Sequence, residues 1–543
     1  MNVTGTLPHP TVDWHAINWR QVNRNVRRLQ SRIAKAMQEG RRGKVHALRR
    51  ILTRSWSAAC WAVRQVTENR GKKTPGIDGV VWSTPKDKQN AIQALQRGRY
   101  QPLPLRRIYI PKADGKKQRP LGIPAMDDRA RQALHALGLD PIAECLADPN
   151  SYGFRRERAP ADAIQQGFIV LAKRDSAQWI LEGDIASCFD QICHRWLVDN
   201  TPMDSGILSK WLKAGYIERQ TFHVTEAGTP QGSTISPMLC NLTLDGLEPL
   251  LKKRFPRRKV HMIRFADDFI VTGESKALLE QEVKPAIVAF LAERGLMLSE
   301  EKTRIVAIEK GFDFLGQNIR KYNGKLIIKP ARKAVKHLLT QARQTLKKHP
   351  TATPAAIIQQ LNPVIRGWAH YHRHVCSKET FAHVDARLTE ALWKWAKRRH
   401  PNKPRRWVKQ RYFTTQAGNH WVFTGTAKDH QVIHLFRAAT LPIQRHTKVR
   451  ANTNPYDPND EVYFETRLAK KWAAGYYGNK RAKQLWLAQQ GQCPYCGHLI
   501  TEETEWDIHH RVPRTEGGPN TIDNLVLLHP TCHRQLHAQK KTL

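Results

Sequence analysis

An acidic doublet lies inside an apolar stretch near the middle of the chain. The run Val260–Val271 places Asp267 and Asp268 between apolar residues, which predicts a β-hairpin whose turn presents both carboxylates. Adjacent acids in such a setting repel each other and lose hydration, and a bound cation relieves both costs. An acidic pair alone is more often a surface turn, so a metal site requires at least one more carboxylate.

Asp184 is the candidate for that third carboxylate. It ends a short apolar run, residues 179–184, which predicts a strand. Three carboxylates from two strands can hold two Mg²⁺ ions about 4 Å apart, and such ions activate an attacking hydroxyl and stabilise a leaving pyrophosphate. The three acids therefore predict phosphoryl transfer, a reaction that needs little beyond alignment and charge neutralisation.

Metal-ligand spacing recurs near the C-terminus. Cys493 and Cys496 are spaced as in half of a zinc knuckle, and His529 with Cys532 supplies the other half. Four such ligands form a closed structural Zn²⁺ site, which a small unit needs for stability. A lone CxxC pair is ambiguous in an intracellular protein, and the paired HxxC lowers that ambiguity considerably.

The same part of the chain is rich in histidine. His533 and His537 are four residues apart, so on a helix they share one face. The pair His509 and His510 lies in an apolar context, and Asn524 precedes a second apolar run. The alternative is a solvated basic tail, which the spacing of these residues argues against.

The composition indicates a large protein that binds a polyanion. With 543 residues, three or four domains are expected, and 40% hydrophobic residues suffice to bury cores. The formal net charge is +42, from 89 Lys and Arg against 47 Asp and Glu. Nucleic acid is the default partner for such a charge, although solubility alone is the simpler alternative.

Three observations predict a cytoplasmic protein without a membrane partner. Six of the nine cysteines are scattered singly, which is typical of a reducing compartment. The N-terminus lacks the pattern of a secretory signal. No apolar run approaches the ~18 residues that span a membrane.

Helices and short strands must position these residues. The apolar spacing of residues 19–69 predicts helices with one packed and one basic face, and residues 71–316 alternate between helices and short strands. Between Asp313 and Glu379 there is no acid and thirteen Lys or Arg. Aromatic residues lie in and beyond this stretch, either as core or as stacking surfaces for bases: Trp368, Tyr371, Trp393, Trp395, Trp407 and Trp421.

The order of the motifs resembles that of reverse transcriptases. Asp184 with Phe189, then Gly228–Ser233, then Phe265–Asp268 follow one another as in that family. Further runs are similar to bacterial group II intron-encoded proteins, and these are Thr74–Gly79, Ile110–Pro124, Asp127–Arg129, Ser151–Arg155 and Gly311–Gly316. The resemblance spans nearly the whole chain.

The resemblance implies a role for each matched residue. Asp184, Asp267 and Asp268 would be ligands of two Mg²⁺ ions, and Phe189 would crowd a ribose 2′ position and so select deoxynucleotides. Three more residues would contact the incoming dNTP or the template: Lys112 and Arg119 on its triphosphate, and Gln231 beside the nucleotide or template. Phe265 stands where the family usually has Tyr, which removes one hydrogen bond worth about 1 kcal/mol.

The basic helical part resembles the maturase domain, or thumb, of the same family. The runs that carry this likeness are Leu361–Pro363, Arg366–Tyr371 and Trp393–Pro401. By this resemblance the helices, with the N-terminal ones, bind group II intron RNA and support its splicing. The segment that follows would bind the DNA target.

The C-terminal part resembles an HNH endonuclease. By that match His510 would be the general base that activates water, and Asn524 would orient its strand. His509, His533 and His537 would hold one divalent ion, Mg²⁺ or Mn²⁺, on the scissile phosphate. Many HNH proteins have Asp where His509 stands, and the paired His of this chain is found in some members.

Together these observations predict a multidomain α+β protein with a right-hand polymerase (fingers and palm), a helical thumb, a basic DNA-binding segment and a C-terminal ββα-metal HNH module. The expected divisions are 1–95, 96–328, 329–411, 412–482 and 483–543. The expected function is reverse transcription, maturase activity and DNA cleavage in intron mobility by target-primed reverse transcription; a homodimer is plausible in this family. The alternatives are a splicing cofactor with a vestigial polymerase and a retron-type or diversity-generating polymerase, neither of which explains the maturase-like block or the HNH-like tail.

Overall fold

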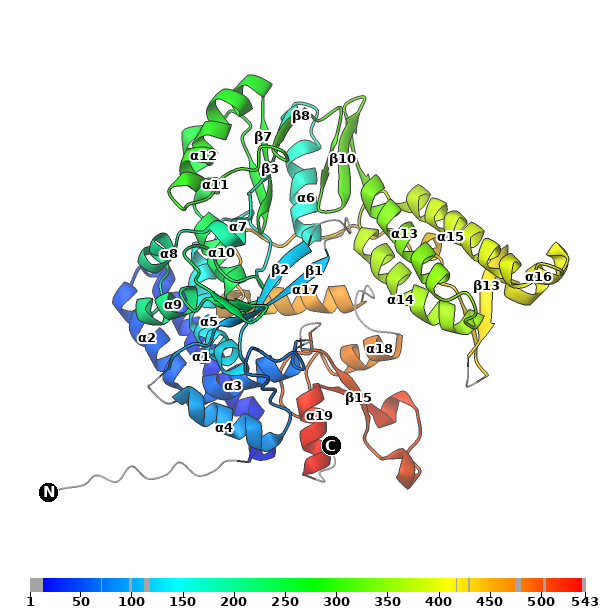
Figure 1. Ribbon diagram of the computed structural model, residues 1–543, viewed down its shortest axis with the longest axis horizontal. Coiled ribbons are helices and arrows are strands. Elements are labelled where there is room, and N and C mark those ends of the chain that lie inside the picture. The colour runs from blue at the N-terminus through cyan, green and yellow to red at the C-terminus, as the bar shows by residue number, and fades with distance from the viewer. Residues whose placement is uncertain are drawn as a thin grey trace.

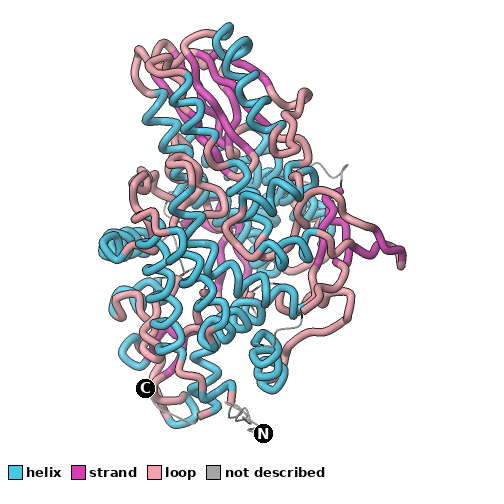
Figure 2. Tube along the Cα trace, turned by 90° about the vertical axis from the view of Figure 1, so that its left-hand side faces the viewer, coloured by secondary structure: helices cyan, strands magenta, loops and turns pink. Residues whose placement is uncertain are grey.

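The computed structural model describes residues 13–539 except 70, 97–99, 112–117, 417, 428–429, 474–479 and 502–503. Figure 1 shows a sheet with helices at the top, N-terminal helices at the left, a helical arm at the right and a C-terminal unit at the bottom. Figure 2, turned by 90°, shows strands gathered at the top and helices filling the middle.

The N-terminal region is helical, as its spacing predicts. Val22, Val26, Leu29 and Ile33 are buried along one face of the first long helix, while its Arg and Lys residues lie on the exposed face. The helix ends at Gln38, and Gly40, just beyond its C-cap, has a φ of 69° that favours glycine. The elements of this region are η1 (Trp14–Ala16), α1 (Trp19–Gln38), α2 (Arg42–Arg54), α3 (Trp56–Glu68), α4 (Pro85–Gln96) and α5 (Met126–Leu146).

A four-stranded sheet of order β2-β1-β4-β5 lies in the region predicted as fingers and is called the fingers sheet. Strands β1 and β2 pair as an antiparallel hairpin. The strands are β1 (Leu105–Pro111), β2 (Gln118–Ile123), β4 (Tyr216–Glu218) and β5 (Thr221–His223).

A second four-stranded sheet, the palm sheet, has the order β6-β7-β3-β8. Its apolar residues alternate between two cores: Leu181 and Val271 face one, and Ile180 and Ile270 face the other. The sheet is therefore packed on both faces, which fixes its register. Its strands are β3 (Trp179–Asp184), β6 (Met262–Phe265), β7 (Asp268–Gly273) and β8 (Arg304–Ala307).

Helices cover both faces of the palm sheet. One face packs on α6 (Pro160–Leu171) and the other on the helices that follow β3 and precede β8. Those helices are α7 (Cys188–Gln191), α8 (His194–Asn200), α9 (Ser205–Leu212), α10 (Ser236–Leu244), α11 (Leu247–Arg254), η2 (Leu278–Val283) and α12 (Lys284–Ala292).

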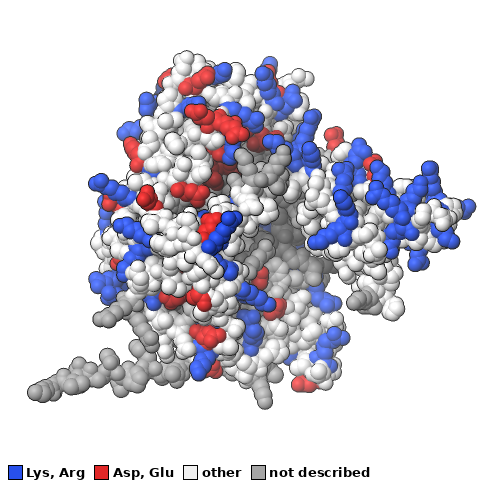
Figure 3. All heavy atoms as spheres, viewed as in Figure 1, with Lys and Arg blue, Asp and Glu red and all other residues white. Residues whose placement is uncertain are grey.

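An arm of helices follows a small sheet of order β11-β10-β9. Basic side chains gather over this arm with few acids among them (Figure 3). The sheet comprises β9 (Phe312–Phe314), β10 (Gln317–Tyr322) and β11 (Lys325–Pro330). The arm comprises α13 (Arg332–Lys348), α14 (Pro354–His372), α15 (Lys378–Arg399), α16 (Arg405–Tyr412), β12 (Phe413–Gln416), β13 (Asn419–Thr426), β14 (Val432–His434) and η3 (Ala438–Thr440).

The predicted DNA-binding segment, 412–482, lies in two places. Phe413, Phe423 and Leu435 belong to the core of the arm. From Gln444 the chain crosses to the palm, and α17 runs below the fingers strands (Figure 1). The elements of this second part are η4 (Pro458–Asp460), α17 (Glu461–Ala473) and α18 (Lys480–Ala488).

The C-terminal unit packs against the N-terminal helices. Leu525–Leu528 and Leu536 share one hydrophobic core with Trp19, Ile33 and Val63. The unit contains β15 (Asp507–His510), η5 (Arg514–Glu516), η6 (Ile522–Asn524), β16 (Leu525–Leu528) and α19 (Pro530–Ala538), and β15 pairs with β16. No helix among the described residues has the length and apolar character needed to cross a membrane.

Candidate active sites and metal centres

Strand pairing brings Asp184 next to the acidic doublet. Asp184 is the direct cross-strand partner of Asp268 in the β3–β7 pair, and Phe265 pairs with Asp268 across the β6–β7 hairpin. Ala266 and Asp267 form the hairpin turn, in which Ala266 has a φ of 57°. The predicted hairpin is confirmed, and all three acids lie at one end of the palm sheet.

Close packing holds this turn in place. A Cβ at Gly153 would lie 2.3 Å from the backbone nitrogen of Ala266, so only glycine lets the Ser151–Arg155 run approach the turn. Gly183, beside Asp184, is restricted in the same way by the ring of Phe269, 2.2 Å from the position of a Cβ. Beneath the turn, the buried Arg264 donates to Asp245.

The three carboxylates, which form the candidate polymerase centre, repel one another. Desolvation, followed by the charges of Asp267 and Asp184, raises the pKa of Asp268 to about 6. Desolvation also raises the pKa of Asp267, with a further contribution from Asp184 and an opposing one from Arg119. A divalent cation would remove this repulsion, and oxygen donors suit Mg²⁺, so the donor set fits that ion.

Lys302, which no sequence motif singled out, is paired with the first carboxylate. Its Nζ lies 2.9 Å from Asp184 Oδ1 and 3.0 Å from Oδ2. The hydrogen bond with Asp184 raises the pKa of Lys302. Lys302 follows the loop in which the Ser299 amide donates to the Asp184 carbonyl at 2.8 Å, and only this fold-level contact reveals its role.

The expected nucleotide-contacting residues lie near this centre where the structure describes them. Phe189 is half-buried in α7 and meets Phe154 edge to face at 6.4 Å between ring centroids. Gln231 Nε2 is 3.4 Å from both carboxylate oxygens of Asp190, and its carbonyl accepts from the amide of Gly122 at 2.8 Å. The structure therefore joins the Gly228–Ser233 loop to Phe189 and the fingers.

The fingers residues and Phe265 complete the set. Arg119 is exposed on β2 opposite Ile110, and its charge reaches Asp267. Lys112 lies outside the described residues. Phe265 is partly buried against the palm core that includes Ile263.

The four predicted zinc ligands are gathered and buried. Ligand atoms of Cys493, Cys496, His529 and Cys532 all lie within 4.8 Å of one another. The knuckle turn is closed by the Gly497 amide, which donates to the Cys493 carbonyl at 2.7 Å. Thiol and imidazole donors in this number and geometry fit a structural Zn²⁺.

The three predicted nuclease ligands are also gathered. His509 on β15 and the pair His533 and His537 on α19 place their ligand atoms within 4.8 Å of one another. His533 Nδ1 lies 3.1 Å from Asp507 Oδ2, so its Nε2 faces the cluster, 3.0 Å from His537 Nε2, where both nitrogens could bind one ion. Asp507 was not selected from the sequence; its place two residues before His509 on the same strand face is the signal that could have found it.

Two further predicted nuclease residues flank this cluster. His510 Nε2 lies 3.3 Å from Asn520 Oδ1 at the exposed end of β15. Asn524 is buried; its Oδ1 accepts from the Val512 amide at 2.8 Å and its Nδ2 donates to the Val512 carbonyl at 3.0 Å. Asn524 thus fixes the loop that leaves the strand bearing His510.

Comparison with known families agrees with this organisation. Four family models match the chain: the N-terminal domain of reverse transcriptase over residues 14–95, reverse transcriptase (RNA-dependent DNA polymerase) over 110–319, the group II intron maturase-specific domain over 335–413 and HNH endonuclease over 493–539. Fold and site therefore define a reverse transcriptase joined to maturase and HNH endonuclease domains.

Similar proteins support the same assignment. Protein YkfC of Escherichia coli is 32% identical over 51% of this chain and 83% of its own length, and the group II intron-encoded protein LtrA of Lactococcus lactis is 31% identical over 48% of this chain and 54% of its own. The type IV methyl-directed restriction enzyme EcoKMcrA of Escherichia coli is 40% identical over 10% of this chain and 23% of its own length. The chain belongs to the group II intron-encoded protein family, which confirms the resemblance seen in the sequence.

A solved structure was also matched. The telomerase of Candida albicans, in complex with a fragment of telomeric RNA, aligns with a TM-score of 0.32 and 12% identity over 57% of this chain and 66% of its own.

The chain is an RNA-directed DNA polymerase with maturase and DNA endonuclease domains.

Proposed function

We propose that the chain carries out target-primed reverse transcription of a group II intron, with Asp184, Asp267 and Asp268 holding two Mg²⁺ ions that activate the primer 3′ hydroxyl and stabilise the leaving pyrophosphate. The observation that carries this proposal is the pairing of Asp184 with Asp268 beside the turn that presents Asp267. Lys302 supplies a positive charge to Asp184 when no metal ion is bound there.

The other residues near the carboxylates position the substrate. Arg119, with Lys112, holds the triphosphate of a dNTP from the fingers. Phe189 crowds the ribose 2′ position and Gln231 lies beside the nucleotide or template. Phe265 keeps the packing of the usual Tyr and changes nucleotide handling.

The C-terminal module cuts the second DNA strand in this proposal. His510 takes a proton from the attacking water, and Asn524 holds its strand. His509, His533 and His537 hold one divalent ion, Mg²⁺ or Mn²⁺, at the scissile phosphate, while the Cys and His tetrad holds structural Zn²⁺. The nick leaves a 3′ hydroxyl, which the polymerase extends along the intron RNA.

The arm and the basic segment bind the two nucleic acids. We assign intron RNA to 329–411 with the N-terminal helices, and target DNA to 412–482. The predicted divisions of the chain, a cytoplasmic location and a homodimer remain predictions.

The polymerase assignment is tested by Asp267→Asn. Losing one ligand charge costs several kcal/mol of transition-state stabilisation, so cDNA synthesis should fall by about 10³-fold. The matched control is Asp199→Asn, an exposed residue on α8. Undiminished synthesis in the Asp267 variant refutes the assignment.

The nuclease assignment is tested by His510→Ala in a reconstituted RNA–protein particle. Second-strand nicking should be lost because the general base is absent, while support of splicing survives. The control is His46→Ala, an exposed residue on α2. Retained nicking in the His510 variant overturns the assignment.

A further inference from the structure

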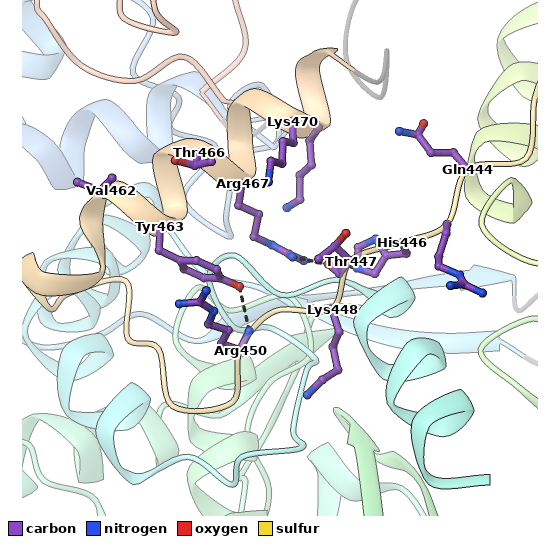
Figure 4. Close-up of a pocket in the computed structure, with 12 residues that line it drawn as sticks. Gln444, His446, Thr447, Lys448, Arg450, Val462, Tyr463, Thr466, Arg467 and Lys470 are labelled. Atoms are coloured by element: carbon purple, nitrogen blue, oxygen red, sulfur yellow. Dashed lines mark hydrogen bonds between the residues drawn. The ribbon is translucent and has the colours of Figure 1, made fainter. Parts of the chain in front are cut away.

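A basic cavity lies between residues 444–450, called the strap, and helix α17 (Figure 4). Its volume is about 540 Å³, within the ~300–1,000 Å³ of ligand pockets. The described lining carries seven basic side chains and no acid: Arg445, His446, Lys448, Arg450, Arg467, Lys470 and Lys471. None of the predicted catalytic residues lines it.

One buried carboxylate fixes the strap. Asp162, at the start of α6, accepts from the Val449 amide at 2.7 Å and from Arg467 Nη2 at 2.7 Å, and lies 2.9 Å from His446 Nε2. The Arg450 amide donates to the Tyr463 hydroxyl at 2.9 Å. The backbone of the cavity is therefore held before any ligand arrives.

The remaining positive charge is not balanced inside the cavity. Arg467 forms an ion pair with Asp162, and Lys471 lies 3.7 Å from Glu157. Within the described chain, no ion pair joins Arg445, Lys448 or Lys470 to an acid. Burial lowers the pKa of Lys448 although Asp162 opposes this. An anion in the cavity would relieve this crowding of cations.

We propose that the cavity binds the phosphate–sugar backbone of a polynucleotide strand, outside both catalytic sites. The cations suit the phosphate, and the exposed Val462 at the edge offers apolar surface to a sugar. The proposal rests on the proposed function, which assigns nucleic acid to residues 412–482, and it narrows that assignment to a contact at the strap and α17. The strap joins the arm, through Gln444 and Arg373, to the palm, so a strand bound there is anchored between them.

The test is the double variant Lys448→Ala with Lys470→Ala, since neither lysine forms an ion pair with an acid of the described chain. Binding of labelled duplex DNA and of structured RNA is measured over a series of salt concentrations. Removing one phosphate contact lowers the slope of log affinity against log salt by about 0.7–0.9, so the slope should fall by about 1–2 for at least one of the two polymers. Primer extension on saturating template tests the polymerase proposal separately.

Two controls keep this test decisive. Lys86→Ala with Lys276→Ala removes the same charge at exposed positions outside the cavity. Lys448→Arg with Lys470→Arg keeps the charge and should keep the slope. If the slope of log affinity against log salt is the same for the Lys448 and Lys470 variant as for the Lys86 and Lys276 control, the proposal is overturned. Inorganic phosphate or ATP that binds wild type in the cavity, without any change in polymer binding by the variant, also overturns it and shows a small-anion site.

A second inference comes from the contact between the C-terminal unit and the N-terminal helices. Gln535 on α19 is fully buried, and its Nε2 donates to the carbonyls of Trp14, His15 and Ile17 at 3.2–3.4 Å. Arg534 lies 3.5 Å from Glu68 on α3.

The knuckle turn makes contacts of the same kind. His498 meets Trp61 of α3 edge to face at 5.6 Å between centroids. A Cβ at Gly497 would lie 3.0 Å from Arg20 Nε on α1. The turn between the two Cys ligands and His498 is thus in direct contact with both helices.

We infer that metal binding at Cys493, Cys496, His529 and Cys532 stabilises helices α1 and α3 as well as the nuclease unit. Three of the four zinc ligands, Cys493, Cys496 and Cys532, belong to the core that these helices share with the C-terminal unit, so loss of the metal would loosen that part of the core. Zinc would then control nucleic-acid binding by the basic face of α1 in addition to DNA cleavage.

Amide hydrogen exchange of the full chain tests this inference. Chelation of zinc, or Cys532→Ser, should remove protection from residues 19–38 and 56–68 and leave α14 and α15 unchanged. His533→Ala, which leaves the four zinc ligands intact, should not change the amide protection of α1 and α3. Unchanged protection of α1 and α3 after metal removal, with zinc release confirmed by metal analysis, overturns the inference.

Discussion

The polymerase centre and the C-terminal module differ in how closely their ligand atoms lie. The C-terminal module holds two clusters of metal-ligand atoms, and within each cluster these atoms lie within 4.8 Å of one another. Among the described residues, Asp184, Asp267 and Asp268 do not form such a group. Neutral imidazole and thiol groups can approach without repulsion, whereas three carboxylates cannot, and Lys302 partly balances them. Packing alone therefore brings the Cys and His ligand atoms together, whereas the three carboxylates need bound cations before their oxygen atoms can come as close.

The same contrast exists among carboxylates. Asp162 is buried among His446 and Arg467, and Asp268 lies among other acids. Burial alone would raise the pKa of Asp162, but the hydrogen bond with His446 and the two positive partners lower it to about 2. Desolvation and repulsion raise the pKa of Asp268 to about 6. Neighbouring charge, more than burial, decides which carboxylate is stable when ionised.

Asp507→Asn tests whether the nuclease cluster depends on its outer carboxylate. Without the charge that orients His533, metal affinity or nicking activity should fall by about 10–100-fold. The measurement is the metal concentration that gives half-maximal nicking. Asp523→Asn, an exposed change in the same module, is the control, and equal metal dependence in both variants would contradict preassembly of the cluster.

Asp162→Asn tests the paired carboxylate. Since its pKa is lowered from about 3.9 to about 2, it contributes about 2 kcal/mol that is present above pH 4 and lost as the pH falls toward 2. The variant should lose amide protection in the strap at pH 7 and show a weaker loss of stability in acid. Asp199→Asn serves as the control, and an unchanged acid profile would show that His446 and Arg467 do not stabilise the carboxylate.

Lys302→Gln tests charge balance in the polymerase centre and has the smallest expected effect. An exposed ion pair is worth about 0.2–1 kcal/mol, so without the lysine the Mg²⁺ concentration for half-maximal binding should fall by a factor of about 1.4 to 5. Isothermal titration calorimetry with Mg²⁺ measures this binding directly. A higher requirement for Mg²⁺ would show that Lys302 supports the bound ion instead of competing with it.

Local patterns predicted the parts of the fold that depend on neighbours in sequence. The hairpin around Asp267, the helical spacing of Val22 to Ile33 and the paired Cys and His ligands are all signals within a short segment. Lys302 is 118 residues from Asp184, and Gln535 is more than 500 from Trp14. Such contacts depend on sheet register and on which surface packs on which, and neither follows from spacing along the chain.

The packing of distant segments on one another does not follow from the sequence, for the same reason. The segment 412–482 reads as one basic stretch, yet Phe423 packs in the arm and Leu468 in the core of the N-terminal helices. The last residues read as a separate unit, yet their core is continuous with that of α1 and α3. Composition shows charge, and only packing shows which apolar residues share a core.

Manganese binding followed by electron paramagnetic resonance tests the central claim most directly. In a His533→Ala background, which removes the nuclease ion, we predict that Mn²⁺ still binds and that Asp184→Asn weakens this binding by about tenfold or more. Asp199→Asn in the same background should bind as its parent does. Identical Mn²⁺ binding with and without the Asp184 carboxylate would contradict the claim that the three acids form one metal site.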